Sequence, residues 1–217
     1  MVPPVNGPGS TRAYRSPRRE EQAAATRRRI LRAAKQLFTT RGYPDTSVAE
    51  VARRAKVSVD TLYTSVGRKP QLLLAVHDMV LGSADEPIPA EQRDYVAAMR
   101  AAIGARAKLA TYAEAMERLL PHTVPLAESL RVAAQTDRDC RKVWDGLNQR
   151  RADNMLRLAA DLRSTGELRD DLTDDDVAHL VWMTNSPEYY QLATSGGRTS
   201  QQYADQVLDL WTRTLLT

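Results

Sequence analysis

The sequence contains little of the chemistry that disulfides, metal sites or membrane spans require. Of its 217 residues one is a cysteine, Cys140, so no disulfide can form within the chain. The three histidines are scattered and show no ligand spacing with that cysteine. No apolar run approaches the roughly 20 residues that cross a bilayer, and the N-terminus has no apolar signal-peptide stretch. We therefore expect a globular cytoplasmic protein without metal, cofactor or membrane partner.

Charge is distributed unevenly along the chain. Residues 1–70 contain 15 lysines and arginines against five acidic residues, a net charge of +10. The whole chain carries +4, so residues 71–217, with 16 basic and 22 acidic side chains, carry −6. A basic N-terminal third indicates a polyanionic partner, and the acidic remainder predicts a different one.

The first 19 residues differ in composition from the rest of the chain. Residues 1–19 combine four prolines and two glycines with four arginines, and they lack apolar periodicity. This composition predicts a flexible basic arm. Such an arm either keeps the protein soluble or, beside a DNA-binding unit, reaches a groove or the phosphates.

Helical periodicity begins at Glu20 and continues to Arg41, where Gly42 can end the helix in a left-handed conformation. Ser47, followed three residues later by Glu50, then forms the S-x-x-E capping box of a helix of about two turns. The sequence thus predicts a long helix followed by a short one.

Two further helices follow closely. Ser58 can cap a third helix, which Gly67 ends, and Pro70 suits the first turn of a fourth helix over residues 71–81. The first three helices predict a small helical unit over residues 20–69.

Beyond a link rich in proline, glycine and aspartate over residues 82–90, helical patterns fill the chain, and no strand pattern competes with them. Turn signals include Pro121 and Pro125. The expected helices cover residues 91–103, 106–120, 124–135, 138–164, 173–194 and 200–216. The sequence therefore predicts an all-α protein in which a larger helical bundle, residues 70–217, follows the small unit.

Two short helices joined by a tight turn and supported by a longer one are what a helix-turn-helix DNA reader requires. Its second helix must enter a major groove about 12 Å wide, so it is short and presents small or polar side chains outwards. The outward set here is Val59, Asp60, Thr61, Tyr63, Thr64 and Ser65.

Residues 46–63, TSVAEVARRAKVSVDTLY, resemble the DNA-binding signature of the tetracycline-repressor (TetR) family. The segments ILRAAKQLF over residues 30–38, RGY over 41–43 and KPQLL over 69–73 are similar too. The resemblance covers about residues 24–81. It implies a dimeric transcriptional repressor that binds double-stranded DNA as a helix-turn-helix protein and leaves a pseudo-palindromic operator when a small molecule binds its bundle.

The sequence departs from the family pattern at three positions. Lys56 occupies a turn position where the family usually has glycine, and a left-handed conformation there would cost on the order of 1–2 kcal/mol, so the turn is either adjusted or slightly strained. Ser65 and Val66 replace a His-Phe pair, which removes an aromatic contact to the fourth helix. Domain coupling or site preference could therefore differ.

The family's roles, carried over by position, divide the DNA-binding residues into two groups. Ser47, Tyr63 and Lys69 are expected to contact phosphate. Val59, Asp60, Thr61 and Thr64 are expected to face base edges or the thymine methyl. Asp60 repels phosphate, so it either accepts from cytosine or simply caps its helix.

A dimer interface is expected on the last two helices, because one short helix contacts too few bases for specificity. Their apolar stripes predict either this interface or ordinary core. The candidates are Val177, Leu180, Val181, Thr184, Tyr203, Val207, Leu210, Trp211 and Leu215.

Aromatic residues and methionines in the bundle could wall an apolar ligand pocket, although at helical spacing they also suit plain core. The pocket candidates are Tyr112, Met116, Trp144 and Trp182, with His122 and Asn148 as polar contacts.

Two other classes of function stay open. A helical enzyme would need a convergent nucleophile, base or metal set, which the sequence does not display. A constitutive DNA-binding dimer or scaffold would have the same fold without a ligand response. The chain is therefore expected not to be an enzyme, and its ligand, operator and target genes stay unidentified.

Overall fold

The computed structural model describes residues 17–217, and the predicted basic arm up to residue 16 lies outside the described residues. Every regular element in this range is a helix, and its one β-bridge is an isolated contact between Leu168 and Leu216. The helices are α1 (Pro17–Arg41), α2 (Val48–Arg54), α3 (Val59–Ser65), α4 (Lys69–Leu81), η1 (Ala90–Gln92), α5 (Asp94–Ala101), α6 (Ala105–Ala133), α7 (Arg138–Arg163), α8 (Asp174–Thr184), α9 (Pro187–Ala193), η2 (Ser195–Gly197) and α10 (Ser200–Leu215). The all-α prediction is confirmed.

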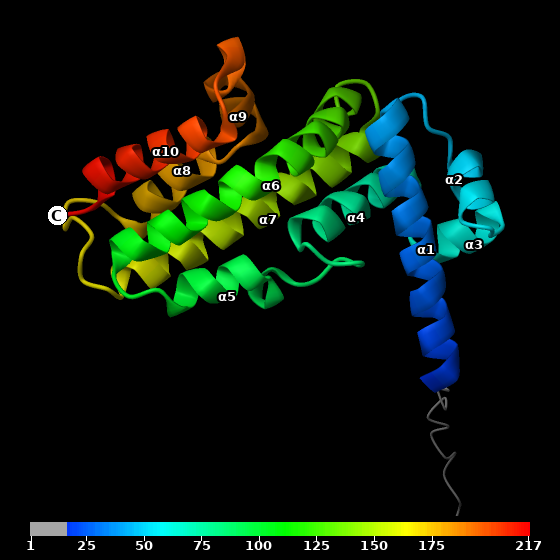
Figure 1. Ribbon diagram of the computed structural model, residues 1–217, viewed down its shortest axis with the longest axis horizontal. Coiled ribbons are helices and arrows are strands. Elements are labelled where there is room, and N and C mark those ends of the chain that lie inside the picture. Colours follow the sequence, from blue (N-terminus) through cyan, green and yellow to red (C-terminus); the bar gives the residue numbers. More distant parts are fainter. Residues whose placement is uncertain (1–16) are drawn as a thin grey trace, which may run out of the picture.

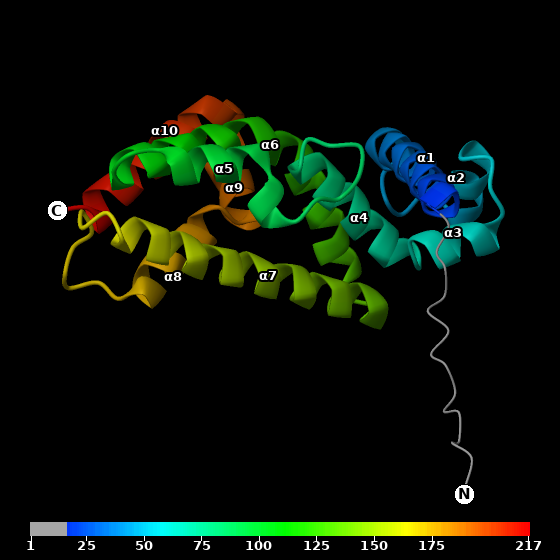
Figure 2. The same cartoon turned by 90° about the horizontal axis from the view of Figure 1, so that it is seen from below.

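The molecule is elongated, with α1 standing across one end of a bundle formed by α5, α6, α7, α8 and α10 (Figure 1). Helices α2 and α3 pack on the far side of α1, and we call α1–α3 the reader unit. Figure 2 shows that α4 lies between the reader unit and the bundle, while the C-terminus lies at the opposite end of the molecule.

The predicted N-caps are present at the starts of the short helices α2 and α3. Ser47 and Glu50 make the capping box at the start of α2, and Ser58 accepts a hydrogen bond from the backbone N–H of Thr61 at the start of α3. Gly42 ends α1 with φ +83°, as expected. Helix α1 begins at Pro17, earlier than the predicted start at Glu20.

The predicted break at Pro121 and Pro125 is wrong, since both prolines lie inside the continuous helix α6. A proline removes one helical hydrogen bond and frees a carbonyl. Both prolines are exposed, so water can reach the freed carbonyls, while the neighbouring Leu120 and Val124 are buried in the core. Tertiary packing on the inner face thus outweighs the local signal to break.

The predicted single helix over residues 173–194 is two helices. Helix α8 ends at Thr184, and Ser186 caps α9 by accepting a hydrogen bond from the Tyr189 N–H at 3.0 Å. Pro187 disfavours the helical conformation of the residue before it, which explains the break.

The hydrophobic core has two parts. One joins α1–α4 with the neighbouring ends of α6 and α7, so that Ile30 and Leu62 belong to the same cluster as Leu130 and Trp144. The other lies among α5–α10 and includes Trp211. The reader unit therefore packs against the bundle through a shared core rather than being joined to it by α4 alone.

Candidate functional site

The turn between α2 and α3 fixes the angle at which α3 is presented. Lys56 adopts the left-handed conformation, with φ +55°, and Val57 donates a backbone hydrogen bond to the Ala52 carbonyl at 3.0 Å. A lysine in this conformation costs on the order of 1–2 kcal/mol. The strain expected from the sequence is present in this turn.

The four predicted base-reading residues lie on α3, but only part of their surface is free. Asp60 and Thr64 are exposed, and Thr61 is partly buried. The Thr64 hydroxyl donates to the Asp60 carbonyl at 2.9 Å. Val59 is partly buried and packs against the core, so it also anchors α3.

The three predicted phosphate contacts are differently engaged. The Tyr63 side chain is exposed, at 46%, and its hydroxyl has no hydrogen bond within residues 17–217. The Ser47 hydroxyl donates to Glu50 at 2.9 Å, and the Lys69 ammonium donates to the Pro44 carbonyl at 3.3 Å. The Lys69 ammonium also lies 4.3 Å from the centre of the Tyr43 ring. Among these three residues, Tyr63 alone has a polar group that makes no hydrogen bond to the described residues.

Further contacts that the sequence did not indicate hold the reader unit in place. Arg27 of α1 donates to the Ser65 carbonyl at the end of α3. The Tyr43 hydroxyl lies 3.4 Å from the Cys140 sulfur at the start of α7, and burial raises the pKa of that tyrosine. Arg68 forms an exposed ion pair with Asp139 at 2.9 Å. These residues connect α1, α3 and α7, and their separation along the chain explains why no local pattern reveals them.

The stripe predicted as a dimer interface mostly faces the interior of the chain. Seven of its nine side chains are at most 1% exposed: Val177, Val181, Thr184, Tyr203, Val207, Trp211 and Leu215. Leu180 and Leu210 are partly buried. Trp211 donates its indole N–H to the Thr184 hydroxyl at 2.8 Å and stacks on Tyr112. For these seven side chains the structure favours the alternative of ordinary core over a subunit interface, because α8 packs mainly on α7 and α10 packs mainly on α6.

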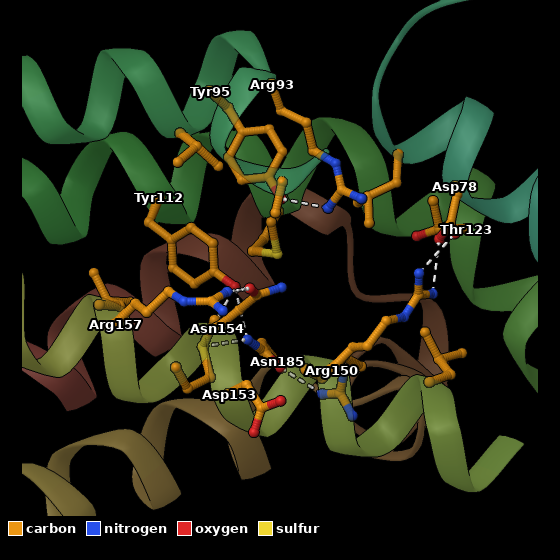
Figure 3. Close-up of a pocket in the computed structure, with 18 of the residues that line it drawn as sticks. Asp78, Arg93, Tyr95, Tyr112, Thr123, Arg150, Asp153, Asn154, Arg157 and Asn185 are labelled. Atoms are coloured by element: carbon orange, nitrogen blue, oxygen red, sulfur yellow. Dashed lines mark hydrogen bonds and ion pairs between the residues drawn. The ribbon is translucent and has the colours of Figure 1, made fainter. Parts of the chain in front are cut away.

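A cavity of about 590 Å³ lies in the bundle among α4, α5, α6 and α7 (Figure 3). Its volume is within the range typical of small-molecule sites. Apolar side chains make up much of its wall, including Met99, Met116, Leu120, Val124, Trp144 and Leu147. Of the predicted pocket residues, Tyr112, Met116 and Trp144 line it.

The other three predicted pocket residues lie elsewhere. His122 is exposed beside a second hollow. Asn148 accepts a hydrogen bond from Arg151 at 3.2 Å, and the guanidinium of Arg151 lies 5.4 Å from the Trp182 ring. Asn148 and Trp182 therefore hold an arginine that lines the cavity, without lining it themselves.

The polar part of the cavity wall was not predicted. Asn185 donates to the Tyr112 hydroxyl at 2.7 Å and accepts from Arg151 at 2.5 Å. Arg93 is 7% exposed and lies across the cavity from these groups (Figure 3). Asn185 lies within the helix that the sequence predicted over residues 173–194, and no sequence signal distinguishes these arginines from exposed ones.

Helix α4 contributes to both parts of the molecule. Near its start Leu72 is buried in the core shared with the reader unit, while His77, Asp78 and Leu81 line the cavity. Asp78 forms an ion pair with Arg150 of α7 at 2.9 Å. Burial alone would raise the pKa of Asp78, but hydrogen bonds from His77 and Arg150 outweigh burial and hold it below its usual value. A molecule in the cavity would therefore touch the helix that leads to α3.

Two absences apply to this part of the chain. Residues 17–217 contain no helix long and apolar enough to cross a membrane. The same residues bring together no group of three or more potential metal ligands.

Comparison with known proteins places the reader unit in a family. The family described as "Bacterial regulatory proteins, tetR family" matches residues 30–76. The HTH-type transcriptional regulator HbdR of Aromatoleum sp. (strain CIB) is 36% identical over 63 residues, a match that spans 29% of this chain and only 28% of that relative.

Solved structures share the fold over most of the chain. A protein from Saccharomonospora viridis, crystallised in complex with choline and described as a transcriptional regulator, has a TM-score of 0.67 at 18% identity, covering 89% of this chain and 99% of that one. A TetR transcriptional regulator from Chloroflexus aurantiacus J-10-FL has a TM-score of 0.63 at 16% identity, covering 91% and 100% of the two chains. Residues 30–76 therefore match the tetR family of bacterial regulatory proteins, and most of the chain shares its fold with solved structures of such regulators.

Proposed function

We propose that this protein is a sequence-specific DNA-binding transcriptional regulator, a repressor that a small molecule releases from a pseudo-palindromic operator. The observation that carries the proposal is the position of α4, which packs with the reader unit at one end and lines the cavity at the other. In this proposal the protein works in the cytoplasm, bound to the nucleoid when it occupies its operator.

DNA binding by α3 is supported by its short length, its capped start and its exposed polar face. Tyr63 and Lys69 would grip phosphates beside it, and Asp60, Thr61 and Thr64 would meet base edges. Ser47 would need to exchange its bond to Glu50 for a phosphate contact.

A homodimer would place two copies of α3 about one helical turn of DNA apart, roughly 34 Å. Since the predicted stripe is buried, the interface would use the outward faces of α8 and α10. Met183 of α8 is 44% exposed. Leu180, also on α8, and Leu208 of α10 are partly buried. These side chains are the proposed apolar part of the interface.

Release follows from a difference in affinity. In one conformation of the dimer, α4 holds the two reader units out of register with the DNA half-sites. A ligand weakens DNA binding only to the extent that it binds this conformation more tightly than the DNA-binding one. Typical coupling energies of about 1–3 kcal/mol correspond to a loss of roughly 5–150-fold. A constitutive DNA-binding dimer would show no such loss with any compound that binds the cavity.

The test is selection of bound sequences from random duplex DNA with the wild type, Tyr63→Phe and Thr64→Ala. We expect a pseudo-palindromic product. Tyr63→Phe removes a hydroxyl that makes no internal bond, so it should weaken binding to all sequences alike, whereas Thr64→Ala should change discrimination by about 1–3 kcal/mol at identifiable base pairs. Lys142→Ala on α7 is the matched control.

Recovery of random sequence would overturn the proposed function, because it would exclude a specific regulator. A Tyr63→Phe variant whose affinity falls for the selected sequence alone would overturn the phosphate-contacting role of Tyr63 and show that this residue reads bases.

A further inference from the structure

Arg93 is a buried cation with almost no partner. It lies between η1 and α5, is 7% exposed, and lines the cavity. Its Nε has no hydrogen-bond partner among residues 17–217, and its Nη1 reaches only the Tyr95 hydroxyl at 3.5 Å. An arginine stays protonated inside a protein, and an uncompensated buried charge destabilises the fold. Within residues 17–217 no carboxylate lies within ion-pair distance of Arg93, so the described residues supply no anion that balances its charge.

Arg151 is a second cation that lines the cavity, on the side of Asn185 and opposite Arg93. Its hydrogen bonds go to neutral oxygens, those of Asn148, Asn185 and the Trp182 carbonyl, and no carboxylate of residues 17–217 lies within ion-pair distance. The Arg151 side chain is partly buried, and desolvation lowers the pKa of its guanidinium. Tyr112 lies beside both arginines and connects to Arg151 through Asn185.

The carboxylates of the wall are committed elsewhere. Asp78 pairs with Arg150 at 2.9 Å, Glu91 with Arg157 at 3.4 Å, and Asp161 with Lys108 at 2.9 Å. Asp153 accepts from the Gln149 amide at 2.9 Å and has no cation within ion-pair distance. None of the four therefore neutralises Arg93 or Arg151.

The remainder of the cavity is apolar and leads towards α4. Met116, Leu120, Val124, Trp144 and Leu147 line it, together with Leu81 of α4. A volume of about 590 Å³ accommodates a chain or ring system in addition to a charged group. The cavity wall thus combines an apolar surface with a buried cation, a chemistry that suits an amphipathic molecule.

We propose that the ligand is an apolar molecule with one compact anionic group, a carboxylate or a phosphate, which Arg93 binds while the apolar part contacts Met116, Trp144 and α4. The inference rests on the proposed function, because we take this ligand to be the small molecule that releases the protein from its operator. Guanidinium groups bind both anions with paired, charge-assisted hydrogen bonds. The apolar part would then displace or hold α4 according to its length.

The experiment compares four probes that share one hydrocarbon chain: octanoate, octyl phosphate, octanol and octyltrimethylammonium. Binding to the full-length protein is measured at neutral pH by calorimetry and by the fluorescence of Trp144 against a Trp144→Phe background. We expect one or both anions to bind roughly tenfold to a hundredfold more tightly than octanol, since hydrogen bonds between charged groups contribute about that factor. Octyltrimethylammonium should bind most weakly. The ratio of octanoate to octyl phosphate identifies which anion the site accepts.

Arg93→Gln should abolish most of the preference for the anion over octanol, and Arg93→Lys should restore part of it. Arg157→Gln is the matched control, because Arg157 lines the same cavity but is exposed and already paired with Glu91. It should change the preference less than threefold, by roughly the small effect of an exposed pair. Without ligand, Arg93→Gln should unfold at the same or a higher temperature than the wild type, whereas loss of a purely structural arginine would lower that temperature.

Three outcomes would overturn the inference: equal binding of octanol and the anions, no binding by any probe, or an anion preference that survives in Arg93→Gln. These outcomes leave the proposed function standing, because a different small molecule could still release the operator. Failure to select a specific DNA sequence would instead remove the proposed function, whichever probe binds.

Discussion

The polar side chains at the start of α2 and on α3 are bonded to near neighbours in the sequence, whereas the polar wall of the cavity also depends on bonds between distant residues. Ser47 pairs with Glu50, and Thr64 with the carbonyl of Asp60. In the cavity, Arg151 meets Asn185, 34 residues away. The polar groups of an exposed DNA-binding surface are hydrated when no DNA is bound. The polar groups of a ligand cavity are shielded from water even when they have no partner. The contrast separates a site built by local sequence from one built by packing.

The largest expected effect tests the inward position of Trp211. Its side chain is fully buried and bonded to Thr184, so Trp211→Ala should lower the free energy of unfolding by about 3–5 kcal/mol. Urea titration followed by circular dichroism measures this loss, which should not vary with protein concentration. Met183→Lys, on the outward face of α8, is the control, and it should leave the intrinsic stability nearly unchanged while shifting sedimentation towards the monomer. A normal unfolding curve for Trp211→Ala with a monomeric sedimentation coefficient would instead place Trp211 at the interface.

A smaller effect concerns the ion pair between Asp78 and Arg150. Asp78→Asn should destabilise the protein by about 1–3 kcal/mol, a moderate loss because the Arg150 side chain is 49% exposed and stays hydrated. The pKa of Asp78 is lowered in the folded protein, so its contribution is complete above the ordinary aspartate value of about 4 and is lost as the pH falls below it.

Urea midpoints at neutral and acidic pH measure this dependence for the wild type and Asp78→Asn, and the difference between the two proteins should shrink in acid. Asp209→Asn breaks an exposed pair with Arg213 and should change stability by less than about 0.5 kcal/mol. If Asp78→Asn matches the wild type at neutral pH, the pair between α4 and α7 does not stabilise this junction.

The smallest effect lies in the reader unit. Lys56→Gly removes the strain of a left-handed lysine and should raise the free energy of unfolding by about 1 kcal/mol. Lys142→Gly, in the interior of α7, should lower it by a similar amount, since glycine is unfavourable within a helix. Thermal unfolding of both variants measures the two signs, and a destabilised Lys56→Gly would show that the lysine side chain makes a compensating contact.

The sequence alone determined the reader unit well. The caps at Ser47 and Ser58 and the turns at Gly42 and Lys56 depend on backbone geometry within a few residues, and each forms as predicted. The outward residues of α3 followed from the same helical register. The roles of these residues on DNA are still proposals.

In the bundle, tertiary packing determined which helices are continuous and which apolar faces are buried. Pro121 and Pro125 do not break α6 because its inner face packs in the core, and the apolar stripes of α8 and α10 serve that core rather than a partner. A sequence pattern shows that a face is apolar but not what covers it. The polar wall of the cavity depends on contacts such as that between Arg150 and Asp78, 72 residues apart. Only the packed chain brings such groups together, and only burial makes an ordinary arginine such as Arg93 an unbalanced charge.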